Sequence, residues 1–254
     1  MSKNFVARIT LFFICVCGLA AAQTPLRIAA AADLQPVLSA LAAVFEKANG
    51  VQIAVSYASS ATLATQILNG APFDLFLAAD TSFPQKVIAG GRAVESAPIV
   101  YAQGTLVLWA RKDVLHAPLT VHFLSDPNVS RIAVANPAHA PYGRAAIAAL
   151  HGLGLYDVLQ SKLVYAENIA QAAQIADSGN AQCGLISRTQ AETATLRADG
   201  NYIAIPASAY PPIEQGAVVI KDSPQSAAAQ NFLHWVLSPQ GQSLLAAGGL
   251  QRAQ

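Results

Sequence analysis

The stretch from residue 51 to residue 70 constrains this chain most, because it joins the pattern of a strand directly to the pattern of a helix. Apolar residues in its first half alternate with small or polar ones, as in a β-strand: Val51, Ile53, Val55 and Tyr57. Apolar residues in its second half recur at helical spacing: Leu63, Ile67 and Leu68. Asn69-Gly70 ends this helix and Pro72 prevents its return. Ser59 and Ser60 therefore lie where a strand meets a helix N-terminus.

This turn has two interpretations. Backbone N–H groups in the first turn of a helix lack intrahelical acceptors, and the helix dipole adds partial positive charge, so the turn can seat an anion. The same hydroxyls can instead form an ordinary N-cap, which nearly every helix needs. The turn alone favours the cap, and the choice depends on whether similar turns occur elsewhere.

Three further strand-to-helix turns with small or polar residues occur, at Ala31-Ala32-Asp33, Pro141-Tyr142-Gly143 and Asn168-Ile169. Two of the four turns fall in a first series of alternating β and α patterns, and two fall in a second series. In open α/β sheets, ligands bind beyond the carboxyl ends of the strands, against helix N-termini. Two lobes with facing turns would surround one small anion with neutral donors. Repetition of the turn therefore favours the anion seat.

The alternation of strand and helix patterns predicts an α/β fold. We expect two α/β lobes with mixed sheets joined by crossing strands. Residues 23–103 and 216–254 are assigned to lobe 1, and residues 104–215 to lobe 2. The apolar run 101–110 is long for one strand and can pass between the lobes, and the run 217–220 can return the chain to lobe 1.

Four helix starts carry capping signals. Asp33 precedes a helical pattern with Pro36 in its first turn, and Asn168 has Gln171 at the capping-box spacing. Ser223-Pro224 and Ser238-Pro239 each place a capping residue before a proline. These residues are expected to begin the helices that follow them.

Residues 1–22 have the pattern of a secretory signal peptide. Lys3 and Arg8 precede an apolar run, and Ala20-Ala21-Ala22 provides a cleavage site before Gln23. The run is short for a membrane span, so a membrane anchor is the less favoured alternative. Cleavage would leave Cys183 as the single cysteine, and its apolar surroundings in the sequence predict a buried, inert thiol.

The composition and the missing motifs exclude several classes of function. A net charge of +1, from 15 Lys and Arg against 14 Asp and Glu, argues against a nucleic-acid partner. The Gly-x-Ser-x-Gly pentapeptide is absent, and the five histidines lack metal-ligand spacing. We therefore assign no catalytic residue, no metal-ion site and no cofactor. The enzyme alternative is a secreted α/β hydrolase-type protein with Tyr142 or His139 as acid–base, but the sequence offers no nucleophile.

Several segments resemble the periplasmic molybdate-binding proteins of ABC transporters. They are residues 28–34, 57–67 and 70–80, together with Ala135-Asn136-Pro137 and the following segment 140–143. The resemblance covers nearly the whole mature chain and implies the type II periplasmic-binding-protein fold. It implies capture of a tetrahedral oxyanion, molybdate or tungstate, by a periplasmic monomer that closes by hinge motion. The implied partner is a transmembrane permease of an ABC transporter.

The resemblance also implies the residues that contact the oxyanion. The first contact falls at Asp33, and the second at Ser60, through its hydroxyl and its N–H. The third falls at Tyr142 or its backbone, and the fourth at the N–H of Ile169. Members with a fifth contact have a Tyr hydroxyl where this chain has the shorter Ser187.

Asp33 departs from the family, which usually has Ser, Thr or Asn at this position. A carboxylate pointed at an anion would be repelled by about 4 kcal/mol per charge pair in a semi-exposed site. Two explanations remain open. Asp33 offers only its N–H while its carboxylate caps the helix away from the ligand, or the ligand is a different anion, such as sulfate, phosphate or a small organic anion.

Overall fold

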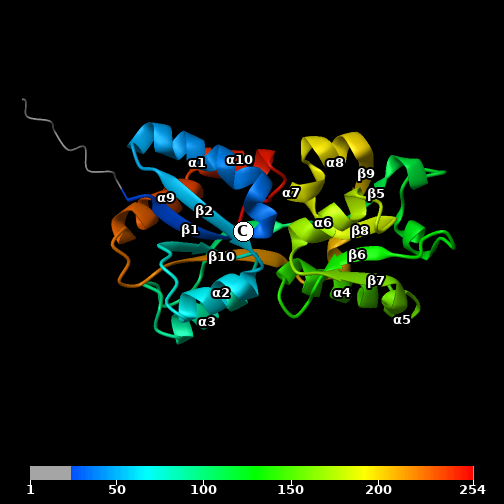
Figure 1. Ribbon diagram of the computed structural model, residues 1–254, viewed down its shortest axis with the longest axis horizontal. Helices are drawn as coiled ribbons and strands as arrows, with labels where there is room; N and C mark the ends of the chain where they lie inside the picture. Colours follow the sequence, from blue (N-terminus) through cyan, green and yellow to red (C-terminus); the bar gives the residue numbers. More distant parts are fainter. Residues whose placement is uncertain (1–23, 254) are drawn as a thin grey trace, which may run out of the picture.

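The computed structural model describes residues 24–253, which form two α/β lobes lying side by side along the long axis of the molecule (Figure 1). Each lobe contains a five-stranded sheet with both parallel and antiparallel pairs. The predicted α/β class with two lobes and mixed sheets is therefore confirmed. The predicted signal peptide, residues 1–22, lies outside the described residues.

Lobe 1 contains both ends of the described chain. Its strands are β1 (Leu26–Ala31), β2 (Ile53–Ala58), β3 (Leu75–Leu77), β4 (Ile99–Gly104) and β10 (Ile213–Val219). Its helical segments are the 3-10 turn η1 (Ala32–Leu34), α1 (Gln35–Asn49), α2 (Ser60–Leu68), α3 (Ser82–Ala89), α9 (Ser226–Leu237) and α10 (Pro239–Ala247). The strand order is β2-β1-β3-β10-β4, with β10 antiparallel to both neighbours.

Lobe 2 is built from the middle of the chain. Its strands are β5 (Leu106–Arg111), β6 (Ile132–Ala135), β7 (Leu163–Ala166), β8 (Cys183–Ser187) and β9 (Gly200–Ala204). Its α-helices are α4 (Pro141–Gly152), α5 (Tyr156–Leu159), α6 (Ile169–Asp177), α7 (Arg188–Ala191) and α8 (Ala194–Asp199). Its 3-10 turns are η2 (Lys112–Val114), η3 (Val121–Ser125), η4 (Gln160–Lys162) and η5 (Ala207–Ala209). The strand order is β7-β6-β8-β5-β9.

The lobe 1 sheet is buried on both faces, as its short apolar strands require. Leu26 and Ile28 of β1 join the cluster formed with α1, α9 and α10, while Ala29 joins the cluster formed with α2 and α3. Successive strand residues point to opposite faces, so one strand contributes to both cores. Helices cover the two faces accordingly (Figure 1).

The chain crosses between the lobes at Thr105, which separates β4 from β5. The predicted long run over residues 101–110 is thus two strands in two sheets. The chain returns to lobe 1 through β10, which begins at Ile213, so the lobe boundary expected at residue 216 falls inside a strand. Glu214 and Gln215 interrupt the apolar pattern at the start of β10 and hide it in the sequence.

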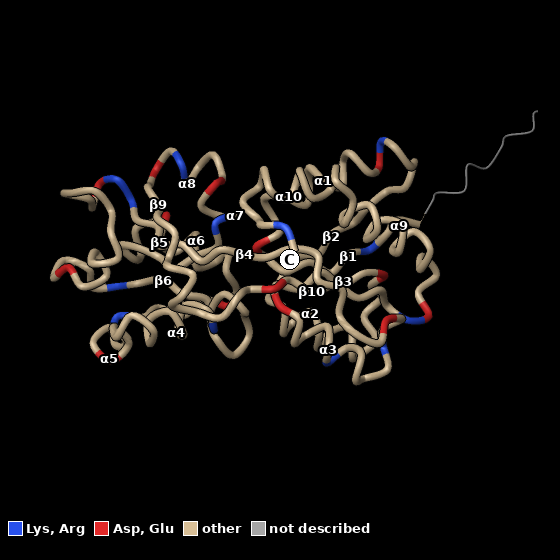
Figure 2. Tube along the Cα trace, turned by 180° about the vertical axis from the view of Figure 1, so that it is seen from behind, with Lys and Arg blue, Asp and Glu red and all other residues tan. Residues whose placement is uncertain are grey.

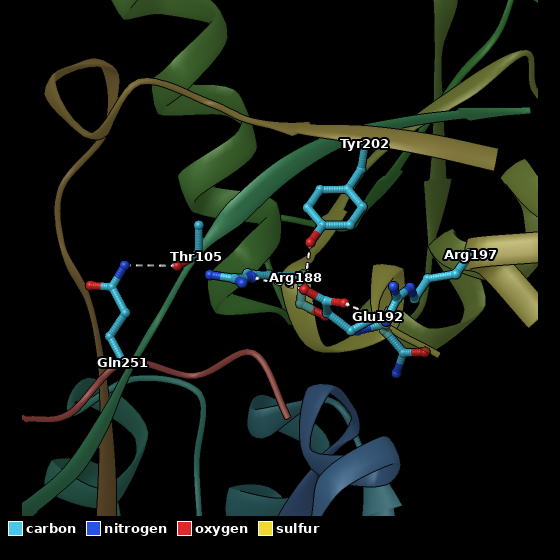
Figure 3. A network of polar contacts seen from close by, with 8 residues as sticks. Thr105, Arg188, Glu192, Arg197, Tyr202 and Gln251 are labelled. Atoms are coloured by element: carbon cyan, nitrogen blue, oxygen red, sulfur yellow. Dashed lines mark hydrogen bonds and ion pairs between the residues drawn. The ribbon is translucent and has the colours of Figure 1, made fainter. Parts of the chain in front are cut away.

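Contacts from both lobes hold the crossing point at Thr105 (Figure 3). Its hydroxyl accepts a hydrogen bond from Gln251 Nε2 at 3.2 Å, and its carbonyl accepts from the Arg188 N–H at 2.9 Å. The Arg188 guanidinium lies 3.2 Å from Glu192, which also accepts a hydrogen bond from Tyr202. The start of α7 and the C-terminal segment of lobe 1 are thereby fixed to one hinge residue.

Direct contacts between the lobes show that they are closed on each other. The Ala61 N–H of α2 donates to the His139 carbonyl at 3.2 Å, and Thr62 Oγ1 donates to Glu167 Oε1 at 3.3 Å. Arg144 of α4 forms an ion pair with Asp80, which precedes α3. These contacts flank the ends of the strands at the facing edges of the two sheets.

Two of the predicted helix caps are confirmed. Asn168 Oδ1 accepts the Gln171 N–H at 3.0 Å, and the Gln171 side chain accepts the Glu167 N–H at 2.6 Å. Ser238 accepts the Gly241 N–H at 3.3 Å at the start of α10. These caps depend on residues within four positions of each other, which is why the sequence pattern suffices to find them.

The two other predicted caps are wrong, for different reasons. Asp33 makes no capping hydrogen bond, and its carboxylate accepts instead from Gln215 Nε2. Ser223 donates to the buried carboxylate of Asp74 at 2.7 Å and accepts the Gln225 N–H at 3.0 Å. It caps no helix, because α9 begins only at Ser226, without a side-chain cap.

Charged residues of both signs are distributed over both lobes (Figure 2). Within residues 24–253, no helix combines the length and the apolar character needed to cross a membrane. Cys183 on β8 is free and fully buried, as predicted. Burial raises the pKa of its thiol to about 12, which keeps it protonated and a poor nucleophile at neutral pH.

The core of lobe 1 yields a stability prediction. Phe232 is fully buried and meets Phe45 edge to face, with ring centroids 5.0 Å apart. Phe232→Ala should lower the free energy of unfolding by about 3–5 kcal/mol, measured by urea denaturation, because the cavity cannot refill. Leu237→Ala on the same helix, where the side chain is 36% exposed, is the control and should cost clearly less. Equal losses would contradict the assigned core.

Candidate functional site

Strand register brings the four predicted turns together in pairs. Ala31 at the end of β1 pairs with Ala58 at the end of β2, so the turns that follow begin side by side in lobe 1. Ala135 of β6 pairs with Ala166 of β7, which aligns the segments leading into α4 and α6 in lobe 2. Parallel strands end at the same sheet edge, and these two edges face each other across the crossing strands.

A small cavity lies between these edges. Its lining residues are Ala31, Ala32, Asp33, Ala58, Ser59, Ser60, Ala79, Ala140, Pro141, Tyr142, Asn168 and Ile169. It encloses about 200 Å³ of empty space, including a part open to solvent. The space within it that a water-sized molecule can occupy is about 10 Å³, so the cavity suits only a very small ligand. The structure thus brings together four of the five predicted site residues: Asp33, Ser60, Tyr142 and Ile169.

Three helices direct their N-termini at the cavity. Ser60 and Ile169 are the first residues of α2 and α6, and Tyr142 is the second residue of α4, after Pro141. N–H groups at these positions have no acceptor within their own helix. Their side chains are at most 3% exposed, so water does not reach them freely. Each N–H can therefore donate to an acceptor in the cavity.

The two serines of the first turn make different contacts. Ser59 is the N-cap of α2 and accepts the Thr62 N–H at 3.2 Å. Ser60 Oγ accepts the Ala79 N–H at 3.1 Å, which leaves its hydroxyl proton available to a molecule in the cavity. Ser59 is thus the cap of α2, while Ser60 can offer its hydroxyl proton to the cavity.

The Tyr142 hydroxyl belongs to a buried polar cluster beside the cavity. It lies 3.4 Å from Gln215 Nε2, which donates to it, and a Cβ at Gly104 would collide with it. Burial, and then the neighbouring Asp33, raise its pKa well above the usual value of 10. A phenol with this pKa stays protonated at neutral pH and is a poor general base. The backbone N–H of Tyr142 is the group that its helix offers to the cavity.

Asp33 is the one acidic residue among those that line the cavity, and it is fully buried. Its Oδ2 accepts a hydrogen bond from Gln215 Nε2, while its Oδ1 has no partner within residues 24–253. Burial raises the pKa of this carboxyl to about 7, and the side chains of Gln215 and Tyr142 offset part of the rise. Asp33 therefore changes its ionisation near neutral pH.

Sequence reasoning missed Gln215 and Tyr101, which position Asp33. Both are buried, and the Tyr101 hydroxyl donates to Gln215 Oε1 at 2.8 Å. This bond turns the amide nitrogen of Gln215 toward Asp33. A polar residue inside the apolar strand pattern of β10 was the available signal, but it lies 182 positions from Asp33 in the chain.

Sequence reasoning also missed two residues of α7. Thr189 Oγ1 donates to the Asp33 carbonyl at 2.7 Å, and Gln190 Nε2 donates to the Ala32 carbonyl at 3.0 Å. These bonds run from lobe 2 to η1 in lobe 1. They fix the backbone that carries Asp33 while the lobes are closed.

Ser187 and His139 do not line the cavity. Ser187 is buried and caps α7, accepting the Gln190 N–H at 3.3 Å, and its hydroxyl pairs with Thr189 at 2.9 Å. The part of His139 that meets lobe 1 is its carbonyl, which accepts from Ala61. Of the two acid–base candidates of the enzyme alternative, Tyr142 lines the cavity and His139 does not.

The field in the cavity comes from dipoles rather than from side-chain cations. Its lining residues include neither Lys nor Arg, while three helix N-termini contribute partial positive charge. Among residues 24–253, no group of three or more His, Cys, Asp or Glu side chains is placed to hold a metal ion. Neutral donors facing a closed space can bind a small anion by hydrogen bonds alone.

Comparison with known proteins decides the family. The family model described as bacterial extracellular solute-binding protein matches residues 26–251. The chain belongs to this family. Its two lobes and the cavity between them are thus those of a solute-binding protein.

Individual relatives of this solute-binding protein agree with one another. Molybdate-binding protein ModA of Rhodobacter capsulatus is 35% identical over 221 residues, covering 85% of this chain and 84% of the relative. ModA of Azotobacter vinelandii is 34% identical over 230 residues, covering 91% of each chain. The solved Azotobacter vinelandii periplasmic molybdate-binding protein matches with a TM-score of 0.83 and 33% identity, over 90% of this chain and 100% of that one. The resemblance indicated by the sequence is thereby confirmed.

The different contacts of the two serines predict that loss of the Ser59 side chain lowers stability but leaves ligand binding unchanged. Ser59→Ala removes the cap of α2 and should lower the free energy of unfolding by about 1 kcal/mol, measured by urea denaturation. Ser60→Ala leaves the cap intact but removes the acceptor of the buried Ala79 N–H, and it should cost about 1–3 kcal/mol. Unchanged stability in Ser59→Ala would contradict the role of Ser59 as the cap.

Proposed function

We propose that this solute-binding protein captures a tetrahedral oxyanion, molybdate or tungstate, between its lobes and delivers it to the permease of an ABC transporter. The observation that carries the proposal is the convergence of the Ser60, Tyr142 and Ile169 N–H groups on one small cavity. Such a site holds the ligand by hydrogen bonds to its oxygen atoms, and no reaction is assigned to it.

Donor placement supports a tetrahedral ligand. The donors come from separate helices in both lobes and so approach the cavity from different sides: α2 from lobe 1, α4 and α6 from lobe 2. Oxygens pointing in several directions can each meet a donor, whereas a flat carboxylate presents only two. The Ser60 hydroxyl adds a further donor beside the Ser60 N–H. On the lobe 1 side, the η1 turn adds Asp33 and the Asp33 N–H to the lining.

The names of the relatives support the choice of metal oxyanion. Both curated relatives and the solved structure described above are molybdate-binding proteins, and each covers more than four fifths of this chain. Tungstate is included because it nearly matches molybdate in size and charge. A periplasmic location, export through cleavage after residue 22, and action as a monomer complete the proposal.

Lobe closure supplies the coupling between capture and delivery. Inter-lobe contacts such as Arg144 with Asp80 form only when the lobes are shut, so the closed shape differs from an open one at the protein surface. A permease that binds the closed shape would take up loaded protein preferentially, since the ligand contributes contacts to both lobes.

Isothermal titration tests the proposed ligand. Molybdate and tungstate should bind much more tightly than sulfate, phosphate or a small carboxylate such as citrate, each added to the purified protein at the same ionic strength. Absence of binding with both metal oxyanions would contradict the proposal. Tighter binding of sulfate or phosphate would keep the anion site and change the ligand.

Ser60→Ala tests the site. Loss of the hydroxyl donor should weaken binding of molybdate by about 1–3 kcal/mol, roughly 5- to 150-fold in Kd, because a hydrogen bond to a charged group is lost. Ser59→Ala is the matched control and should bind molybdate with nearly the Kd of the unmodified protein. An unchanged Kd for Ser60→Ala would remove its hydroxyl from the site.

A further inference from the structure

The carboxyl group of Asp33 is a buried polar group that the proposed function leaves unexplained. Four side-chain atoms among residues 24–253 are buried without a hydrogen-bond partner, and Asp33 Oδ1 is the one whose residue lines the cavity. Buried polar atoms in native proteins usually have a partner, so an orphan at a ligand site indicates that the ligand supplies one. The N–H groups at the cavity are donors without an acceptor, so a ligand that they hold presents acceptors. An ionised Asp33 carboxylate is itself an acceptor and does not match such a ligand.

The surroundings of Asp33 decide which oxygen carries a proton when one is present. Tyr101 donates to Gln215 Oε1 at 2.8 Å, so the amide nitrogen of Gln215 faces Asp33 Oδ2 and donates to it. Oδ2 is therefore an acceptor in either charge state. A proton on the neutral acid belongs on Oδ1, the oxygen with no partner. In that form Asp33 offers an O–H donor at the cavity.

Charge decides which form is compatible with a dianion. An ionised carboxylate in contact with the ligand is repelled by its negative charge, and a partly buried site screens this repulsion much less than bulk water does. The lining residues include no Lys or Arg to offset this repulsion. The neutral acid removes the repulsion and adds a hydrogen bond, so the two forms of Asp33 differ strongly in affinity.

We propose that Asp33 is a neutral carboxylic acid in the loaded protein and donates a hydrogen bond from Oδ1 to the oxyanion, so that binding takes up one proton. This rests on the proposed function for the identity of the ligand. Asp33 then acts as the Ser, Thr or Asn that the family usually has here, and it adds a dependence on pH. The step is a protonation only: the carboxylate gains H⁺ from solvent, and no bond of the ligand changes.

Other ionisable groups near η1 have to be separated from Asp33. The elements that pack against η1 are α1, β2, α6 and α7. The ionisable residues of these elements are Glu46, Lys47, Tyr57, Asp177 and Arg188. Glu167 precedes α6, and the buried phenols of Tyr101 and Tyr142 lie beside Asp33. Arg188 pairs with Glu192, and burial raises the pKa of the three tyrosines. His139 lies in the loop before α4.

The sign of the pH effect follows from the proposal. The ligand raises the pKa of Asp33 above its value in the ligand-free protein, since a nearby negative charge favours the neutral acid. Affinity is therefore full at low pH and falls as the pH rises through the ligand-free pKa, up to tenfold per pH unit. Burial already places that pKa at about 7 in the closed form. Between pH 6 and pH 9 the Kd for tungstate should rise by about 100-fold.

The test is titration of the purified full chain with tungstate at pH 6, 7, 8 and 9, repeated at pH 8 in buffers with different ionisation enthalpies. The dependence of the heat on the buffer gives the number of protons taken up. The unmodified protein should take up close to one proton at pH 8. Asp33→Asn keeps the shape and a neutral donor, and it should bind with a flat pH profile and no proton uptake.

Two controls assign the effect to Asp33. Glu167→Gln and His139→Gln should keep the proton uptake and the pH dependence of the Kd of the unmodified protein. Any pH dependence that remains in Asp33→Asn measures protonation of the ligand itself. Thermal unfolding checks that each variant is folded.

Proton uptake near zero in the unmodified protein, or the same pH profile in Asp33→Asn, would overturn the proposal. Tighter binding of hydrogen phosphate than of tungstate at pH 8, lost in Asp33→Asn, would also overturn it, because Asp33 would then be an acceptor. Absence of tungstate and molybdate binding at every pH would instead overturn the proposed function.

Discussion

Backbone N–H groups without acceptors at the starts of α2, α4 and α6 are the constraint on which the rest of the structure depends. Helix N-termini that are exposed can bond to water, but Ser60, Tyr142 and Ile169 are buried between closed lobes. The oxygens of the proposed ligand can supply the acceptors that these donors lack. The parallel register of β1 with β2 and of β6 with β7 places these helix starts at two facing edges. The crossing at Thr105 brings these edges to face each other. The position of the site therefore depends on both the sheet topology and this crossing.

Asp33 shows how a site made of donors can contain an acid. Its charge is controlled by burial and by a chain of buried contacts that leads through Gln215 to Tyr101 on the crossing strand β4. The same residue is held from the opposite lobe by Thr189, which binds its carbonyl. Closure, hydrogen bonding and protonation at Asp33 are thus linked, and a change in one changes the others. This linkage makes the acidic residue compatible with a site for anions.

The sequence predicted those features that depend on neighbours in the chain. Strand and helix periodicity gave the α/β alternation, and local spacing gave the caps at Asn168 and Ser238. Prediction failed at Asp33, where a distant partner competes with a local one: Asp33 looks like a cap, but Gln215 takes its side chain. It also failed at Ser223, because α9 begins only at Ser226. Four of the five expected site residues line one cavity, because each lies within the first two residues of a helix or shortly before one. Ser187 also precedes a helix, and there the local cap prevails over the site.

A crystal structure of the protein with molybdate, with anomalous diffraction measured at the molybdenum absorption edge, tests the central claim most directly. One strong anomalous peak is expected between the lobes, at a position where the oxygens of molybdate can accept hydrogen bonds from the N–H groups of Ser60, Tyr142 and Ile169. Asp33 Oδ1 should lie at hydrogen-bond distance from a ligand oxygen. A peak at another place, or a cavity without a peak in crystals that hold molybdate elsewhere, would contradict the account.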